Sequence, residues 1–512
     1  MDAPAPPRPA IAWKVLLALM AVKLALHAVS NGPLAWGYMT DELYFLDSTT
    51  RLQWGYVDHP PLSIAVLALL RPVTGDTVFA IRILPALLGA ATVMVSGLLA
   101  REMGGGRTAQ GLAALAALAT PVMLTMSSYY SMNAFDELFW PLGMWLLLRL
   151  LNGGTPALWL ALGATMGLGL LSKVSMLWFC AGIAAGLVLT PARRWLSTPW
   201  PWLAGLIALV MFAPYVLWNW ANGWPFLEFS RNAAADKIGD VSLAAFAVQQ
   251  VMVLGYVTAP LWVAGMVYGY TARETRRYRA ALWVFVTAAA ILALSGSSRP
   301  HYLAPAFPLA FACGAVLAER LAVRWRWLPA AVAAALLLTL VIAAPVTMPL
   351  LPPAQTVAYI DRLGLRPPEE RERGGLLPMH LGLYFHAEAL LGPLVQVYEN
   401  LAPDERARAE ILVNSFGEAG AVNVLGGARG LPHAIGRHNQ YGLWGPGDAS
   451  GEVMLVVDDN EDELRDWFEH CERRAEIECA YCMEMMDAQA VYLCHRARRP
   501  LREVWPQMRY YR

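Results

Sequence analysis

The stretch Tyr38–Leu62 reads YMTDELYFLDSTTRLQWGYVDHPPL and lies between two strongly apolar segments. A plain connection between apolar helices needs only a short polar turn, whereas this one gathers acids, an imidazole and aromatic rings. These side chains are Asp41, Glu42, Asp47, Asp58, His59, Tyr44, Trp54 and Tyr56. Because loops that carry such groups commonly hold binding or catalytic residues, the stretch is a candidate active site.

The composition predicts a membrane protein. Of 512 residues, 57% are hydrophobic and only 15% are charged, which is too much apolar surface for an ordinary soluble fold. The formal net charge is zero and no strongly basic segment suggests a nucleic-acid partner. The chain is therefore expected to cross a lipid bilayer several times.

Apolar runs of the length that crosses a bilayer recur along the first 350 residues. The first, Val15–Val29, has no small-residue cleavage site of the usual kind, so we expect a retained helix and not a removed signal peptide. Further runs lie at 77–100, 108–126, 133–151, 157–171, 174–190, 200–221, 246–270, 280–295, 301–318 and 327–349. The sequence predicts about eleven transmembrane helices.

The distribution of Arg residues predicts the orientation of these helices, because cytoplasmic loops collect Lys and Arg. With the N-terminus inside, the cytoplasmic connections carry Arg101, Arg107, Arg149, Arg193, Arg194, Arg273, Arg276, Arg277, Arg279, Arg320, Arg324 and Arg326. The opposite connections hold most of the acids. An odd number of spans then places residues after about 350 outside the cytoplasm.

Residues 351–512 have the composition of a soluble domain. Ile411–Asn414 and Val453–Asp458 are predicted to be short buried strands, and Glu461–Arg474 an amphipathic helix with Leu464, Trp467, Phe468 and Cys471 on one face. We expect a transmembrane domain at 1–350, with a catalytic loop at 31–76, and an extracytoplasmic α/β domain at 351–512.

Four of the six cysteines, Cys471, Cys479, Cys482 and Cys494, fall in this second domain. An oxidising compartment would favour disulfides, which is the preferred interpretation, although the sequence does not give the pairing. Buried thiols and a zinc site at Cys479 and Cys482 are the alternatives, but no second pair has zinc-finger spacing. Cys180 and Cys313 are expected to pack within the membrane.

The acids of the first loop have a structural explanation as well as a functional one. Thr40 can cap a helix that begins at Asp41, and Asp41 and Glu42 would then be first-turn acids favoured by the helix dipole. Asp58 and His59 close the same loop at its other end. Because two acidic clusters at an apolar boundary need partners or a task, we favour function.

Other connections on the same predicted face add to the candidate site. Asp136 and Glu137 open the run at 133–151, and Lys173 lies between two apolar runs, where it is either a snorkelling lysine or a cation for an anionic ligand. The same two interpretations, an interfacial side chain or a cation for an anionic ligand, apply to Arg299 and His301. Acidic and cationic side chains together suggest a site that binds a phosphate group and a hydroxyl group.

The segment WNWANGWPF, with Trp218, Trp220 and Trp224, is typical of an interfacial aromatic belt, and a sugar-stacking or lipid-guiding role is the alternative. The polar loop 230–242 that follows is a candidate lid over a bound donor.

Several motifs resemble one known group of enzymes. TDELYFL and GYVDHPPL, followed in order by SMNAFDELFW, GLGLLSKVSML, YVLWNWANGWPFLEF and RPHYLAPAFPLAF, are similar to motifs of the GT-C fold glycosyltransferases of families 39 and 83. That group includes protein O-mannosyltransferases and the aminoarabinose transferases of lipid A. The resemblance covers roughly residues 11 to 320, and SFGEAGAVNVLG and LPHAIGRHNQYGLWGP resemble stretches in the extracytoplasmic tails of bacterial members.

The resemblance implies a sugar donor carried on polyprenyl phosphate and transfer with inversion outside the cytoplasmic membrane of a bacterium. It implies that Asp41 is the base, with Glu42 beside it. Asp58 and His59 match the end of the family's first loop, Asp136 its second acidic position, and Lys173 its basic residue near the donor phosphate. The second motif reads FDELF here, where many relatives have Thr-Asp followed by small residues, so the role of Asp136 stays open.

The chemistry of transfer fits these residues. A hydroxyl nucleophile needs a carboxylate to accept its proton, and we assign that role to Asp41. Carboxylates stabilise an oxocarbenium-like transition state, and a departing phosphate needs cations, for which Lys173, Arg299 and Arg231 are candidates. Tyr44, Asp58, His59, Asp136 and His301 are assigned to substrate binding, and a divalent metal ion is a further candidate, although spacing alone identifies no metal site.

Two other functional classes remain open. A lipid-carrier transporter or flippase would have as many spans, but it should show internal repeats and broken helices near the midplane. A non-catalytic envelope assembly protein would keep the second domain and lose the first-loop acids. The sugar, the acceptor (lipid, glycan or protein) and the oligomeric state are not predicted.

Overall fold

The computed structural model describes residues 8–235, 241–296, 298–365, 375–483 and 489–512. They belong to two compact units. The helical unit comprises Met1–Ala35, Phe79–Trp218 and Asp240–Leu351, and the sheet unit comprises Trp36–Val78, Asn219–Gly239 and Pro352–Arg512. The sequence-based division into a catalytic domain at 1–350 and a soluble domain at 351–512 stays a prediction.

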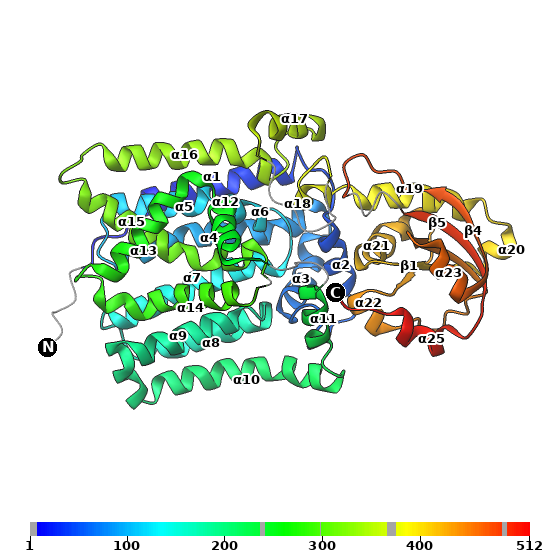
Figure 1. Ribbon diagram of the computed structural model, residues 1–512, viewed down its shortest axis with the longest axis horizontal. Coiled ribbons are helices and arrows are strands. Elements are labelled where there is room, and N and C mark those ends of the chain that lie inside the picture. Colours follow the sequence, from blue (N-terminus) through cyan, green and yellow to red (C-terminus); the bar gives the residue numbers. More distant parts are fainter. Residues whose placement is uncertain (1–7, 236–240, 297, 366–374, 484–488) are drawn as a thin grey trace. The chain divides into compact units, whose positions relative to one another are not determined.

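Helices make up the helical unit, and many of them run side by side (Figure 1). They are α1 (Trp13–Asn31), α4 (Val78–Glu102), α5 (Arg107–Ala119), α6 (Pro121–Met126), α7 (Met132–Leu151), α8 (Leu158–Ser172), α9 (Met176–Leu189), α10 (Trp200–Ala221), α12 (Leu243–Leu254), α13 (Ala259–Thr271), α14 (Arg279–Leu294), α15 (Phe307–Leu321) and α16 (Leu328–Thr347). Short 3-10 helices occupy Pro191–Ser197, Tyr256–Thr258, Arg276–Tyr278 and Pro300–Ala306. Every apolar run predicted from the sequence is therefore helical.

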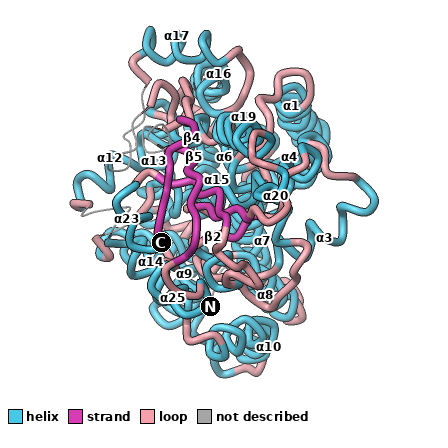
Figure 2. The backbone as a smooth tube through the Cα atoms, turned by 90° about the vertical axis from the view of Figure 1, so that its right-hand side faces the viewer, coloured by secondary structure: helices cyan, strands magenta, loops and turns pink. Residues whose placement is uncertain are grey.

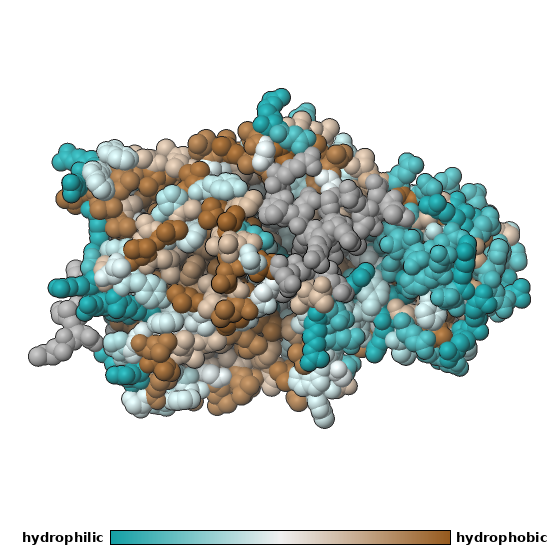
Figure 3. Space-filling model, viewed as in Figure 1, coloured by the Kyte–Doolittle hydropathy of each residue, from teal (hydrophilic) through white to brown (hydrophobic). Residues whose placement is uncertain are grey.

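Many apolar side chains are exposed on the helices of the helical unit, as contact with lipid favours. On α10, Leu206, Leu209 and Val210 are each more than half exposed, and hydrophobic residues are widespread on this face (Figure 3). Within the described residues, six helices are long and apolar enough to cross a membrane, and two strongly bent helix pairs raise that number to eight. The protein is a membrane protein, and the count of eleven spans stays a prediction.

Glycines let these helices pack closely. A Cβ added to Gly182 or Gly186 on α9 would meet the backbone of α14 at Val284 and Ala280. Gly265 on α13 and Gly314 on α15 make an equally close pair. Small residues at helix crossings are the usual device where lipid supplies no hydrophobic driving force between helices.

The sheet unit combines short helices with a five-stranded sheet (Figure 2). Its helices are α2 (Thr40–Ser48), α3 (Leu62–Thr74), α11 (Pro225–Ala233), α17 (Pro353–Leu363), α18 (Met379–Gly382), α19 (His386–Glu399), α20 (Pro403–Arg406), α21 (Phe416–Ala421), α22 (Asn439–Trp444), α23 (Glu461–Trp467) and α25 (Leu501–Met508). Short π and 3-10 helices lie at Val422–Gly426 and Gly427–Arg429. The strands are β1 (Glu410–Val413), β2 (Ala434–Gly436), β3 (Val453–Asp458), β4 (Phe468–Glu476) and β5 (Ala490–Ala497).

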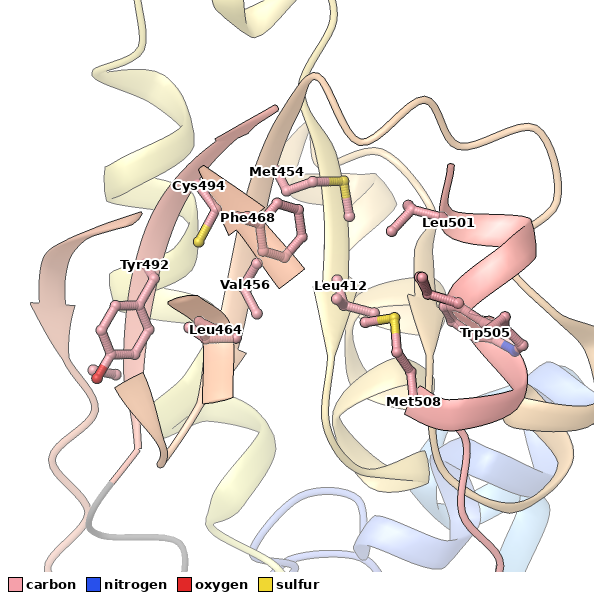
Figure 4. Close-up of a cluster of buried hydrophobic side chains, with 12 residues drawn as sticks. Leu412, Met454, Val456, Leu464, Phe468, Tyr492, Cys494, Leu501, Trp505 and Met508 are labelled. Atoms are coloured by element: carbon pink, nitrogen blue, oxygen red, sulfur yellow. The ribbon is translucent and has the colours of Figure 1, made fainter. Parts of the chain in front are cut away.

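The strand order is β2-β1-β3-β5-β4, with β1 parallel to β2 and β3, and β5 antiparallel to β3 and β4. In the register, Ile411 faces Leu455 and Leu412 faces Val456. The two strands predicted from apolar runs are confirmed, and all six residues of β3 are buried, as central strands covered on both faces are. Leu412, Met454, Val456, Phe468, Trp505 and Met508 belong to one hydrophobic core (Figure 4).

The helix predicted over Glu461–Arg474 is wrong in its second half. The Asn460 side chain accepts a hydrogen bond from the Glu463 amide and begins α23, but this helix ends at Trp467. From Phe468 the chain continues as β4, which pairs with β5. Phe468 is buried in the core, so strand pairing and core packing override the helical periodicity of this segment.

The disulfide interpretation of the four cysteines in the sheet unit is confirmed. Cys471 on β4 is bonded to Cys494, its direct neighbour on β5, and Cys479 is bonded to Cys482. The zinc alternative for Cys479 and Cys482 therefore does not apply to this oxidised state. Cys180 and Cys313 are free thiols in the helical unit.

The hydrogen bonds at the first turn of α2 differ from the prediction that Thr40 caps this helix. Thr40 does not cap the helix: its amide and its hydroxyl both donate to the carbonyl oxygen of Leu383, at 3.2 and 2.9 Å. The capping group is Glu42, whose Oε2 accepts a hydrogen bond from the Met39 amide at 2.9 Å. A carboxylate at this position satisfies an amide that has no partner within the helix.

Helix α2 packs against α21 at very short range, and two glycines make this approach feasible. A Cβ on Gly417 would collide with the Thr40 side chain, and one on Gly420 would lie 2.7 Å from the Tyr44 amide nitrogen. The obstacle at Gly420 is backbone, which cannot rotate away.

The replacement Gly420→Ala should therefore destabilise the sheet unit by about 1–3 kcal/mol, since a methyl group forced into a close-packed contact strains it. The measurement is the unfolding midpoint of the purified protein. Gly427→Ala is the matched control, because nothing lies within 4 Å of a Cβ at that position. Equal midpoints for the two variants would contradict the close contact between α2 and α21.

Candidate active site

The candidate residues fall into two groups, one in each unit. Asp41, Glu42, Tyr44, Asp58 and His59 belong to the sheet unit. Asp136, Lys173, Arg299 and His301 belong to the helical unit. Contacts within the sheet unit join Tyr44, Asp58 and His59. Contacts within the helical unit join Asp136 to Lys173 and, through Tyr302, Lys173 to His301.

Asp41 and Glu42 are neighbours in the first turn of α2 but differ in burial. Asp41 is half-buried, whereas Glu42 is fully buried and holds the Met39 amide. Glu42 thus has a structural task that the sequence did not reveal. The catalytic assignments of both residues stay predictions.

Tyr44 joins the two ends of the first loop. Its hydroxyl donates to Asp58 Oδ1 at 2.8 Å. Burial, followed by the neighbouring Asp58 charge and this hydrogen bond, raises the pKa of Tyr44 well above its ordinary value. Tyr44 therefore stays a protonated donor at any physiological pH and fixes the Asp58 carboxylate.

His59 is buried among aromatic rings. It stacks on Phe45, with ring centroids 4.7 Å apart, and packs against Tyr56. Its Nδ1 lies 2.9 Å from the Pro60 carbonyl oxygen, so this nitrogen is the donor. Nε2 lies 4.0 Å from Asp58 Oδ1 and makes no hydrogen bond to any described residue.

The first loop is also held by residues of 415–426 and 431–446, the two stretches that resemble parts of the extracytoplasmic tails. Asp47 accepts hydrogen bonds from Asn423 Nδ2 at 2.9 Å and from the Tyr441 hydroxyl at 2.6 Å. Gln440 Oε1 accepts from the Val57 amide at 3.0 Å. Burial and the Asp47 charge raise the pKa of Tyr441, which keeps its hydroxyl a donor.

In the helical unit, Asp136 and Lys173 form one network. Asp136 accepts hydrogen bonds from Trp140 Nε1 and Ser175 Oγ, each at 2.9 Å, and its Oδ2 lies 3.7 Å from Lys173 Nζ. Lys173 also donates to Asn133 Oδ1 at 2.8 Å and lies over the Tyr302 ring. The Lys173 side chain keeps 15% of its surface exposed, so its charge is both held in place and accessible.

His301 packs edge-on against Tyr302, with ring centroids 4.9 Å apart, and Tyr302 carries the Lys173 ammonium group on its face. The connection after α14 is thereby linked to Lys173. Arg299 is half-buried two residues earlier in the same connection. Arg231, the further cation proposed from the sequence, is exposed on α11 in the sheet unit.

Sequence reasoning missed Lys23, a further buried ionisable residue of the helical unit. Lys23 on α1 is almost fully buried, and its Nζ donates to the Met123 carbonyl oxygen at 2.7 Å. Glu137, also buried, lies 3.5 Å from the Ser127 hydroxyl. A lone lysine inside the first apolar run was the available signal, since ionisable residues within membrane helices are rare and usually functional.

No group of three or more His, Cys, Asp or Glu side chains suited to a metal ion occurs in the described part of the chain. The structure therefore offers no ligand set for the divalent ion considered from the sequence, and no step is assigned to one. The aromatic belt residues Trp220 and Trp224 are 68% and 41% exposed, in agreement with either role. The candidate lid lies partly outside the described residues, since 236–240 are not among them.

Comparisons with known proteins identify the fold. Residues 58–218 match the family model described as dolichyl-phosphate-mannose-protein mannosyltransferase. No curated protein matches the chain significantly by sequence.

Solved structures match over almost the whole chain. ArnT from Cupriavidus metallidurans bound to undecaprenyl phosphate aligns with a TM-score of 0.60 and 14% identity, covering 94% of this chain and 98% of ArnT. Its apo state gives a TM-score of 0.61. The archaeal oligosaccharyltransferase AglB from Archaeoglobus fulgidus aligns with a TM-score of 0.50 and 13% identity, covering 85% of this chain and 65% of AglB. The expectation drawn from the motifs is thus confirmed: the chain is a membrane protein with the fold of the GT-C glycosyltransferases.

Proposed function

We propose that this protein is an inverting glycosyltransferase that moves a sugar from a polyprenyl-phosphate donor to a lipid, glycan or protein acceptor of the cell envelope. One observation carries the proposal: the chain shares its fold, over nearly its whole length, with ArnT bound to undecaprenyl phosphate. The family model matched by residues 58–218 is named for enzymes that use a lipid-phosphate mannose donor, which supports the same donor class.

Asp41 is the proposed base. In the reaction the acceptor oxygen bonds to the anomeric carbon, its proton passes to the Asp41 carboxylate, and the bond to the phosphate oxygen breaks. General-base catalysis of this kind contributes roughly 10²- to 10⁴-fold. The difference in burial supports the choice, because Asp41 is half-buried whereas its neighbour Glu42 is fully buried.

Lys173 is the proposed cation for the departing phosphate. A phosphate leaves as a stable anion, so a fixed positive charge assists more than a general acid would. Asn133 and Asp136 hold the Lys173 ammonium group, and the side chain is partly exposed. Arg299 and His301 are further donor-binding candidates, and Tyr44, Asp58 and His59 are assigned to the sugar or the acceptor.

The proposed location is the cytoplasmic membrane of a bacterium, with the N-terminus inside and the sheet unit outside. Two facts support this orientation: the predicted inner connections are basic, and the sheet unit carries two disulfides, which form and persist outside the cytoplasm.

The variant Asp41→Asn should lose sugar transfer by about 10²-fold or more, because the amide cannot accept the proton of the hydroxyl. The assay presents radiolabelled sugars on a panel of polyprenyl phosphates to membranes containing the protein, with total envelope acceptors present. The donor that supports transfer would also identify the sugar.

Asp466→Asn is the control for this experiment, since Asp466 is an exposed acid on α23. Undiminished transfer by Asp41→Asn at equal expression would remove Asp41 from its role and point to Asp58 or Asp136. No transfer from any donor by the wild type would refute the proposed function.

The variant Lys173→Met should lower kcat/KM for the donor by about 10- to 100-fold, while Lys173→Arg restores part of it, because the arginine keeps the charge. Lys14→Met is the control, since Lys14 is exposed on α1. Unfolding midpoints separate this effect from loss of the contact with Asp136. An unchanged dependence on donor concentration would rule out a donor-phosphate role for Lys173.

The orientation predicts that Glu399→Cys, exposed on α19, reacts with a membrane-impermeant maleimide in intact spheroplasts. Arg107→Cys, at the start of α5 in a predicted inner connection, should react only after permeabilisation. The reverse pattern would place the sheet unit in the cytoplasm.

A further inference from the structure

A polar cavity lies in the sheet unit, at residues to which the proposed transfer reaction gives no role. Its volume is about 530 Å³, within the range of small-molecule binding sites. The lining includes Asn414, Arg437, Asp459, Asn460 and Tyr510. Such sites are mostly apolar in proteins that bind drug-like ligands, so this polar lining indicates a polar ligand.

The cavity lies where the sheet topology favours ligand binding. The chain passes from β1 to β2 on one side and then to β3 on the other, which makes the gap between β1 and β3 a topological switch point. In open α/β sheets, ligands bind beyond the carboxyl ends of the strands at such a point. Asn414 directly follows β1, Arg437 follows β2, and Asp459 follows β3, so all three parallel strands contribute a residue.

Arg437 forms a fixed wall of the cavity. It is 3% exposed and forms ion pairs with Asp458 and Glu463, each at 2.6 Å. A third bond runs from its Nη2 to Asn414 Oδ1 at 3.0 Å. Because its charge is already balanced by two carboxylates, Arg437 is not available as an anion-binding group, and its role is to orient Asn414.

The remaining lining groups identify the class of ligand. The charged side chains that line the cavity, Arg437, Arg512, Asp459 and Glu463, balance each other formally. Glu463 is already paired with Arg437, so a phosphate or other anion would meet the Asp459 carboxylate beside Arg512. Three side-chain amides, from Asn232, Asn414 and Asn460, and the two tyrosines Tyr510 and Tyr511 complete the lining. Amides and hydroxyls both donate and accept hydrogen bonds, and aromatic rings offer apolar faces.

We propose that this cavity binds a neutral carbohydrate, a sugar unit or a short glycan, whose hydroxyl groups pair with the amides and carboxylates of the lining. The inference goes beyond the transfer reaction, because it concerns a site formed by the strand ends of the sheet unit. Binding here needs neither a donor nor Asp41.

The test is binding of defined sugars to the full-length protein in lipid nanodiscs, without sugar-based detergents, which would compete. The probes are methyl α-D-mannopyranoside, N-acetylglucosamine, galactose and maltotriose, with inorganic phosphate as the anionic comparison, measured by saturation-transfer NMR and titration. At least one sugar should bind, and Asp459→Ala and Asn232→Ala should each weaken it about tenfold or more. Asp466→Ala, on α23 outside the lining, should leave the Kd unchanged.

Three results would overturn the proposal: no sugar of the panel binds, phosphate binds more tightly than every sugar, or the Kd is the same in Asp459→Ala, Asn232→Ala and the wild type. Asp459 is exposed, so Asp459→Ala should keep the unfolding midpoint of the wild type. Asn232 Nδ2 donates to the Tyr511 carbonyl oxygen at 2.7 Å, so the Kd of Asn232→Ala is compared at temperatures below its own unfolding midpoint. Because no transfer is measured, failure of the glycosyltransferase assay would leave this result interpretable by itself.

Discussion

The candidate catalytic loop depends on one close contact, the packing of α2 against α21. Gly417 and Gly420 remove the side chains that would keep these helices apart, so α21 can touch the Thr40 side chain and the α2 backbone at Tyr44. The loop is some 370 residues away in sequence from this partner. Its conformation is therefore set by the C-terminal part of the chain and not by the turn that connects it to its neighbours.

The acidic residues of the first loop are chemically similar but make different contacts. A buried carboxylate is costly unless it is paired or hydrogen-bonded. Glu42 binds the Met39 amide, Asp47 binds Asn423 and Tyr441, and Asp58 binds Tyr44. These contacts fix the loop around the half-buried Asp41. Most of the acidic residues that suggested catalysis therefore have a structural role, since they hold the loop in place.

Local patterns in the sequence predicted the local structure well. Long apolar runs became the helices of the helical unit, and the apolar runs at 411–414 and 453–458 became β1 and β3. The same reasoning failed at 468–474, since pairing of Cys471 and its neighbours with β5 is a long-range effect that periodicity does not record. Of the site, motifs singled out Asp136 and Lys173 one by one, and the structure adds that they pair, whereas Lys23 has no motif around it. The contacts of Asp47 with Asn423 and Tyr441 could not be predicted, because no sequence pattern in either segment indicates that the two segments are in contact.

One short segment connects the sugar cavity with the loop. Residue Asn414, at the end of β1, lines the cavity, and α21 begins two residues later. Glu418 fixes this turn, because its Oε2 accepts hydrogen bonds from the Asn414 and Ser415 amides, each at 2.9 Å. Its other oxygen accepts from Gln489 Nε2 at 2.7 Å. Both carboxylate oxygens of Glu418 are thus engaged in holding the turn between β1 and α21. Since α21 also meets the backbone of α2 at Gly420, one continuous segment of the sheet unit both lines the cavity and packs against the helix that carries Asp41.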